Sequence, residues 1–216
     1  SVKVIADQAG VQPSSLVRFA KHMGYNGFSE MKRVFQSHLI STASSKERLE
    51  SFSYEVSPAP RNSPATFLET LVNNDIAALN DLKNSISPEA IEQAVTLLQE
   101  AETIYVLGQL RSFSVAYNMR YLLLYLRQNV RLLDGSGGLA TEEAELMSEK
   151  SLLVAVSFRY YAREVVDIVE GTARKNIPIL AITDSQLSPL NKHSTCSLVV
   201  PGAGHKFSYS LATTTV

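Results

Sequence analysis

The sequence is poor in several residue types, and each absence narrows what the protein can be. Its 216 residues include one cysteine, Cys196, and no tryptophan. A single cysteine excludes internal disulfide bonds and is typical of a reducing cytoplasm. Cys196 lies in an apolar, strand-like run, which favours a buried structural thiol over a reactive one. The four histidines have no metal-ligand spacing with that cysteine, so we expect no metal and no cofactor.

Long apolar runs are absent as well. No run approaches the roughly 18 apolar residues that a membrane-spanning helix needs, and the first residues do not read as a signal peptide. Apolar residues nevertheless make up 45% of the chain and charged residues 19%, which indicates a folded core rather than a disordered chain. We therefore expect a cytoplasmic protein with one medium and one small domain, and no membrane partner.

Charge is distributed unevenly along the chain. Residues 1–38 carry five lysines and arginines against two acidic residues, whereas the whole chain has a net charge of −1. A basic N-terminal segment joined to an acidic body suggests a polyanionic partner for that segment alone.

Composition divides the chain into three parts: helical residues 1–40, a linker at 41–63, and a larger domain at 64–216. The linker is predicted because these residues lack periodicity and contain two prolines and many serines. Ser-Pro pairs at 63–64 and 87–88 are typical of helix starts. The two helices are expected to bury Phe67, Leu71, Ile76, Leu79, Leu82, Ile91, Val95 and Leu98. Both ends stop abruptly, which suggests a longer protein.

From residue 103 onward, short apolar runs alternate with helical segments. Continuous apolar strands that alternate with helices indicate an α/β fold with a parallel sheet covered on both faces. The predicted strands are 103–108, 130–134, 152–157, 178–183 and 197–200, and the predicted helices between them are 112–127, 140–147 and 164–175.

The N-terminal segment, residues 2–24, reads as two helices joined by a tight bend. Ala6 is small enough for a close helix contact, Gly10 supplies the turn, and Pro13 suits the first position of the second helix. This spacing fits a helix-turn-helix. Its small core is expected to contain Ile5, Ala9, Val11, Leu16 and Phe19.

The second of these helices is expected to project polar and basic side chains into a DNA major groove. Ser14, Ser15 and Arg18 would contact bases, and Lys21, Lys32 and Arg33 would mainly contact phosphates. The predicted DNA-binding residues are Gln12, Ser14, Ser15, Arg18 and Lys21. A plain helical hairpin with a solvated face explains the same spacing.

A more specific motif follows in RFAKHMGYNGFSEMKRVF, residues 18–35. With Arg18-Phe19, Gly24-Tyr25, Gly27-Phe28 and Met31-Lys32, this segment resembles the N-terminal domain of RpiR-type transcriptional regulators, with Met23 in place of the family's leucine. That family's domain has one more helix upstream, which is missing here. The resemblance implies a homodimer, or a dimer of dimers, on an approximately palindromic operator.

RpiR-type regulators join this domain to a sugar isomerase (SIS) domain, a module that commonly binds phosphosugars, and residues 87–202 resemble it in element order. The resemblance implies a flavodoxin-like five-stranded parallel sheet with strand order 2-1-3-4-5, preceded by a small all-α helix-turn-helix domain. Ligands of such sheets bind where the strand order reverses, outside the carboxyl ends of the strands. The loops at 108–112 and 157–163 meet there, and each leads into a helix N-terminus that suits an anion.

Both loops depart from the family's patterns. The first keeps Gly108 and Ser112 of Gly-x-Gly-x-Ser but has Leu110 in place of the second glycine. The second keeps Ser157 of Ser-x-Ser-Gly-x-Thr but continues with Arg159, Tyr160 and Ala162. After the fourth strand, residues 183–184 (Thr-Asp) and 188–190 (Ser-Pro-Leu) match the family.

Three interpretations of residues 157–163 remain open. Arg159, with Arg111 or Arg163, could pair bidentately with a phosphate or carboxylate. Alternatively, Tyr160 and Tyr161 could fill the pocket, so that the domain only dimerises, or all these side chains could face solvent. On the first interpretation the ligand-binding residues are Gly108, Arg111, Ser112, Ser157, Arg159, Tyr160, Arg163 and Thr183.

Two functions compete. The first is a transcriptional regulator whose SIS domain senses an anionic sugar metabolite, a sugar phosphate or a sugar acid, and thereby alters operator binding. The second is a phosphosugar isomerase, which needs a positioned acid and base. Its only candidates are Glu142, Glu143, Glu145 and His193. A Glu-rich helical stretch usually forms a solvated face, so we expect a regulator and not an enzyme.

Overall fold

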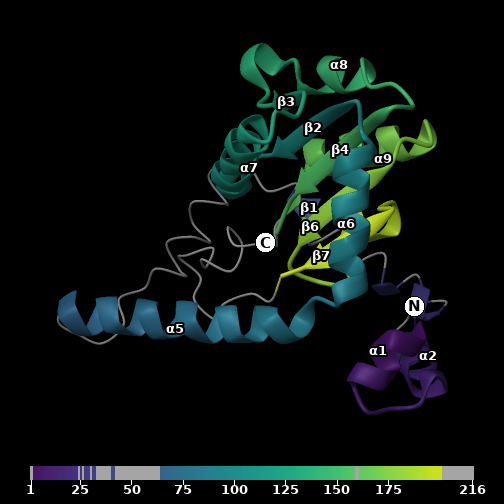
Figure 1. The fold of residues 1–216 in the computed structure, drawn as a ribbon. Helices are drawn as coiled ribbons and strands as arrows, with labels where there is room; N and C mark the ends of the chain where they lie inside the picture. Colours follow the sequence, from purple (N-terminus) through teal and green to yellow (C-terminus); the bar gives the residue numbers. More distant parts are fainter. Residues whose placement is uncertain are drawn as a thin grey trace.

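The computed structural model describes residues 2–23, 25, 27–29, 31–32, 40–41, 64–158 and 161–200. Its centre is a five-stranded, fully parallel sheet with strand order β3-β2-β4-β6-β7 (Figure 1). This order confirms the predicted 2-1-3-4-5 arrangement, and each predicted strand end lies within one residue of the observed one. The strands are β2 (Thr103–Gly108), β3 (Val130–Leu133), β4 (Ser151–Val156), β6 (Ile179–Thr183) and β7 (Cys196–Val199).

Helices cover both faces of the sheet because successive strand residues point to opposite sides. In β2, Ile104 and Val106 face one core and Tyr105 and Leu107 face the other. All residues of β4 are buried. The first core packs against α5 (Pro64–Ser85), α6 (Pro88–Glu100) and α7 (Phe113–Tyr125), and the second against α8 (Ala140–Glu145) and α9 (Arg163–Arg174).

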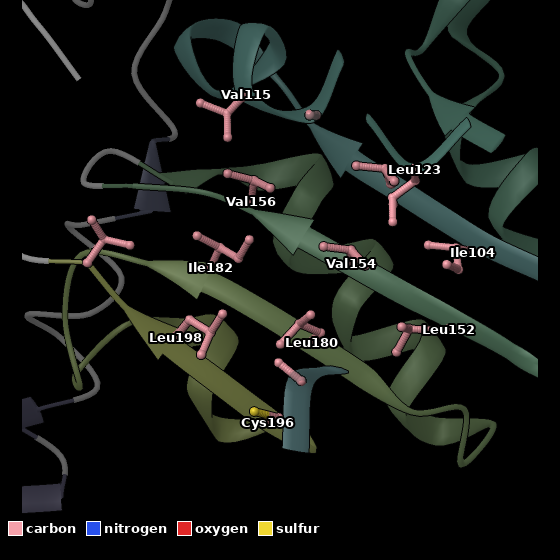
Figure 2. Packing of buried hydrophobic residues seen from close by; sticks show 14 of the residues in the cluster. Ile104, Val115, Leu123, Leu152, Val154, Val156, Leu180, Ile182, Cys196 and Leu198 are labelled. Atoms are coloured by element: carbon pink, nitrogen blue, oxygen red, sulfur yellow. The ribbon is translucent and has the colours of Figure 1, made fainter. Parts of the chain in front are cut away.

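Figure 2 shows the first core along the sheet, where Val154, Leu180 and Leu198 lie on neighbouring strands below Val115 of α7. Cys196 is buried in this core, in agreement with a structural thiol. The start of α6 is also as expected, since the Ser87 side chain accepts a hydrogen bond from the Ala90 N–H at 3.2 Å.

The inward faces of α5 and α6 were predicted incorrectly in part. Ile91 is 49% exposed and Val95 is 44% exposed. The small residues Ala90 and Ala94 face the sheet instead, because their size lets the helix axis approach the strands closely. Leu79, Leu82 and Leu98 pack inward as expected, Ile76 is exposed, and the side chains of Phe67 and Leu71 lie outside the described part of the chain.

Exposed aromatic side chains also lie along α7. Tyr117, Tyr121 and Tyr125 are spaced four residues apart, and all three are exposed. The Tyr121 and Tyr125 rings pack edge to face with centroids 4.9 Å apart, and their hydroxyl oxygens are 2.9 Å apart. Among the described residues, no helix combines the length and the apolar character needed to cross a bilayer.

The N-terminal residues form α1 (Val2–Gln8) and α2 (Pro13–His22), joined at Gly10. Gly10 has φ +64°, Ala6 is fully buried and Pro13 begins α2, so these three expectations are confirmed. The predicted core was partly wrong, because Ala9, Val11 and Phe19 are exposed. The core instead centres on Ala20, Phe28 and Met31, with Val2, Ile5, Leu16, Val17 and Tyr25 packed against it. Phe28 and Met31 pack against the side of α2 that carries Leu16 and Ala20, so Phe19 on another side of the helix stays exposed.

A second, two-stranded sheet joins distant segments. β1 (Ile40–Ser41) pairs in parallel with β5 (Tyr161–Ala162), directly before α9. No sequence pattern predicted either strand.

Candidate functional site

The candidate site lies at the carboxyl edge of the sheet, where β2, β4 and β6 end side by side. The register pairs Gly108 with Val156 and Val156 with Ile182. The loops that follow these strands therefore begin at one edge. Gly108, Ser112, Ser157 and Thr183, which the sequence predicted as ligand-binding residues, belong to these strand ends and loops.

The first loop requires a glycine at its start. A Cβ atom on Gly108 would lie 2.7 Å from the Ser112 carbonyl oxygen and 2.8 Å from the Ala116 Cβ, well inside contact distance. The missing side chain thus lets the strand end pack directly under the turn that opens α7. That turn is a short 3-10 helix, η1 (Leu110–Ser112), and α7 begins at Phe113, one residue after the predicted start at 112.

Leu110 has a backbone conformation that normally belongs to glycine. Its φ is +55°, in the left-handed region, and its side chain is 58% exposed. This is the position at which the resembling family has its second glycine. The loop therefore keeps a glycine-type backbone path although the residue has changed, and the added side chain points to solvent.

The second loop sends its aromatic residues to opposite faces of the sheet. Phe158 is buried in the first core, and Tyr161 is 2% exposed in the second. Ser157, directly before Phe158, is also buried, and its N–H donates to the Ile182 carbonyl at 3.1 Å. Arg159 and Tyr160, both predicted ligand-binding residues, lie outside the described residues.

The Tyr161 hydroxyl donates a hydrogen bond to Asp184 Oδ1 at 2.7 Å. Burial raises the pKa of this phenol, and the negative charge of Asp184 and the hydrogen bond to it raise it further, while Ser188 and Thr183 act in the opposite direction. Tyr161 is therefore a neutral donor that ties the second loop to the residue after β6. Sequence reasoning placed Asp184 in a family motif but did not pair it with Tyr161.

A second bridge joins the first loop to α9. The Gln109 side-chain amide donates to the Glu164 carboxylate, which lies in the first turn of α9. A carboxylate at a helix N-terminus interacts favourably with the helix dipole. It also places a negative charge where the sequence predicted a bound anion. Neither residue was among the predicted site residues, because the bond joins positions 55 residues apart.

Arg111 and Arg163, the predicted site arginines that the structure describes, differ in their surroundings. Arg111 is exposed on η1, at the mouth of the first loop. Arg163 pairs with Asp167 one turn along α9, with Nε–Oδ distances of 3.0 and 3.1 Å. Arg163 therefore has an acidic partner on its own helix, and its ligand-binding role stays a prediction.

Thr183 supplies a buried hydroxyl at the end of β6. Its side chain is fully buried, and its Oγ1 has no hydrogen-bond partner of ordinary geometry among the described residues. Such a group is costly unless something binds it. Ser112 is likewise buried, at the start of α7.

The four candidate residues for isomerase chemistry are divided between α8 and the segment after β6, and two of them pair with α9 or with the residue that follows it. Glu145 pairs with Lys175 at 2.6 Å, beyond the last residue of α9 and therefore at the opposite end of that helix from the site. His193 Nε2 lies 3.9 Å from Glu170, two turns into α9. Glu142 is exposed and Glu143 is half-buried on α8.

The predicted DNA-binding side chains share one short helix or its cap. Gln12, Ser14, Arg18 and Lys21 are exposed, and Ser15 is half-buried. Lys32 is half-buried, and Arg33 lies outside the described residues.

Two family models match this chain. Residues 97–216 match the SIS domain, and residues 1–42 match the helix-turn-helix domain of the rpiR family. Among curated proteins, the chain is 31% identical over 186 residues to an uncharacterized HTH-type transcriptional regulator of Escherichia coli, YfhH. That match covers 85% of this chain and 63% of YfhH, so the chain spans less than two thirds of that relative.

Solved structures are also similar to this chain. The sugar isomerase domain of an RpiR transcription factor from Sphaerobacter thermophilus matches with a TM-score of 0.63 and 30% identity, over 67% of this chain and 81% of that one. The Vibrio vulnificus NanR protein, solved in complex with ManNAc-6P, matches with a TM-score of 0.62 over 100% of this chain and 73% of NanR. Its identity of 19% indicates a shared fold alone.

Proposed function

The chain belongs to the RpiR family of transcriptional regulators, and on that basis we propose that its SIS domain binds an anionic sugar metabolite and thereby alters operator binding. The metabolite is a sugar phosphate or a sugar acid. In this proposal residues 1–40 read DNA, residues 41–63 link the two parts, and residues 64–216 bind the metabolite and dimerise.

The observation that carries the ligand half is the backbone of the first loop. Leu110 keeps a φ of +55° although a leucine is disfavoured there, and Gly108 has no room for a side chain. Backbone geometry of this kind lets main-chain N–H groups face a bound anion. Its retention after the loss of the second glycine supports a loop that still holds a ligand.

The side chains at the same edge support an anion with hydroxyl groups. Ser112 and Thr183 offer buried hydroxyls near the starts of α7 and the loop after β6. Arg111 supplies a positive charge at the mouth, and Arg159 and Tyr160 would complete the shell from the second loop.

The DNA half rests on α2. Exposed Gln12, Ser14 and Arg18, with half-buried Ser15, would reach base edges, and Lys21 would contact phosphate. Homodimerisation would place two such helices on an approximately palindromic operator. The exposed aromatic residues of α7, together with Ile91 and Val95 of α6, provide apolar surface for that association.

A thermal-shift screen with the full-length protein tests the ligand half. The panel contains inorganic phosphate, hexose 6-phosphates, ManNAc-6P and sugar acids. A ligand at a hundredfold excess over its Kd adds about 2.7 kcal/mol, which raises the Tm of a protein of this size by roughly 5–10 °C. Arg111→Ala should reduce the shift, and Lys150→Ala, at the opposite edge of the sheet, should not. A panel without a single shift would contradict metabolite binding.

Fluorescence anisotropy tests the DNA half. The probe is operator DNA selected from a random duplex pool with the wild-type protein. Arg18→Ala should weaken binding and relax the sequence preference, while Lys21→Ala should weaken binding to all sequences and reduce its salt dependence. Equal affinity of Arg18→Ala and wild type for every sequence would exclude Arg18 as a base-reading residue.

A further inference from the structure

The chain returns to the second ligand loop soon after the N-terminal helices end. Ile40 pairs with Tyr161 and Ser41 with Ala162, and β1 also lies against α9. Ile40 follows Lys32 by only eight positions, and eight residues span at most about 28 Å. The strand that touches the ligand loop is therefore on a short tether to the helices proposed to read DNA.

β5 is anchored on its own side of this pairing: Tyr161 is buried in the second core, its hydroxyl is hydrogen-bonded to Asp184, and Glu164, two residues beyond Ala162, is hydrogen-bonded to Gln109. Among the described residues, β1 pairs with this edge at Ile40 and Ser41. Such a ladder depends on the backbone path of β5, so a change in that path shifts the pairing equilibrium.

The main chain around Ala162 and the start of α9 adjoins both β1 and the proposed anion site. Ala162 immediately precedes α9, so its neighbourhood includes the first N–H groups of that helix, which have no partner within the helix. An anion bound at this N-terminus would contact the main chain directly beside the residues with which β1 pairs. Each N–H donates to one partner at a time, so ligand binding and strand pairing influence each other.

We propose that the edge of β5 is the docking site for the segment that follows the helix-turn-helix, and that ligand binding weakens this pairing. The pairing couples the metabolite site to the DNA-binding helices. This inference rests on the proposed function for the identity of the two sites it connects. By linkage, DNA that favours the paired state also weakens ligand binding by the same factor.

A disulfide bond across the pair provides the test. In a Cys196→Ala background, Ser41→Cys and Ala162→Cys place two thiols at directly opposed ladder positions, where strand spacing suits a disulfide. Oxidation should produce a crosslink within one chain. The matched control combines Ser41→Cys with Arg174→Cys at the far end of α9 and should remain uncrosslinked.

Two readouts decide the coupling. The oxidised and reduced forms of the Ser41→Cys/Ala162→Cys protein should differ about tenfold or more in affinity for the selected operator DNA, within the usual range of allosteric coupling. A panel compound that binds the reduced form should lower its crosslinking rate, and should lose its effect on DNA affinity once the crosslink has formed. Inorganic phosphate and ManNAc-6P are the first probes.

The inference is overturned by crosslinking no faster than in the Arg174→Cys control, by a crosslink between two chains, or by equal DNA affinities of the oxidised and reduced forms. It is also overturned if a bound probe leaves the crosslinking rate unchanged. If no probe binds, the proposed sensing function fails, yet the crosslink and the DNA affinities still judge the coupling.

Discussion

In the first loop, residues 108–112, a leucine occupies a backbone conformation that normally belongs to glycine. Leu110 retains the left-handed conformation of a glycine and turns its side chain to solvent. In the second loop, residues 157–163, aromatic side chains have become part of the framework, since Phe158 enters one core and Tyr161 the other. The difference shows two ways to place bulky side chains in loops at one sheet edge, outward into solvent or inward into the cores. In these two loops the inward side chain Tyr161 also makes a hydrogen bond, to Asp184.

The largest effect is expected at the start of the first loop. Gly108→Ala places a Cβ against the Ser112 carbonyl oxygen and Ala116, both of which belong to closely packed elements. Overpacking of this kind costs about 1–3 kcal/mol, so the Tm should fall by roughly 2–12 °C. Gly171→Ala is the matched control, because its Cβ meets nothing closer than 3.7 Å. Equal Tm values for the two variants in scanning calorimetry would show that the first loop tolerates a side chain at its base.

In the second loop, the stability of the fold is expected to depend on the Tyr161 hydroxyl. Tyr161→Phe keeps the buried ring but leaves Asp184 without this donor, which costs about 1–3 kcal/mol. Tyr125→Phe removes an exposed hydroxyl and should cost much less. Chemical denaturation of both variants measures the difference.

The Tyr161 effect should also depend on pH. The folded protein raises the pKa of this phenol above its unfolded value, so its stabilisation is complete below about pH 10 and declines as the pH rises further. The stability difference between wild type and Tyr161→Phe should therefore narrow in alkaline solution. A constant difference up to the highest pH at which the protein stays folded would argue against the Tyr161–Asp184 bond.

The hydrogen bond between Gln109 and Glu164, which joins the first loop to α9, places a negative charge beside the proposed anion site. Glu164→Gln preserves the shape of the side chain and removes the negative charge from the first turn of α9, so affinity for an anionic ligand should rise several-fold. Asp167→Asn removes the same charge one turn away and frees Arg163. Titration calorimetry with the compound found in the thermal-shift screen compares them. Unchanged affinity in Glu164→Gln would place the anion away from α9.

The smallest effect is expected at Leu110. Leu110→Gly relieves a disfavoured φ but adds freedom to the unfolded chain, so the two contributions nearly cancel and the Tm should change by little. Leu110→Val should instead lower stability by about 1–2 kcal/mol, because β-branched residues tolerate positive φ poorly. If Leu110→Gly destabilised the protein as much as Leu110→Val, the side chain rather than the backbone would matter here.

Much of the fold could be predicted because strands and helices leave local patterns. The five apolar runs and the Ser87-Pro88 helix start correspond to observed elements within a residue or two. The choice of the buried face was less predictable. On α6 the sequence favoured Ile91 and Val95, but the sheet is packed against alanines, since closeness of the helix axis mattered more than side-chain size. On α2, downstream Phe28 and Met31 decided which side is buried.

The sequence by itself determined the order of the elements and the parallel sheet, because these follow from local periodicity, and its family resemblance predicted the strand order and the edge where we expect a ligand. Only the tertiary structure decided which groups meet at that edge. The bond from Tyr161 to Asp184 joins residues 23 apart, and that from Gln109 to Glu164 joins residues 55 apart. The pairing of Ile40–Ser41 with Tyr161–Ala162 spans most of the chain. Such contacts depend on how loops are brought together in space, and no local spacing of residues encodes that distance.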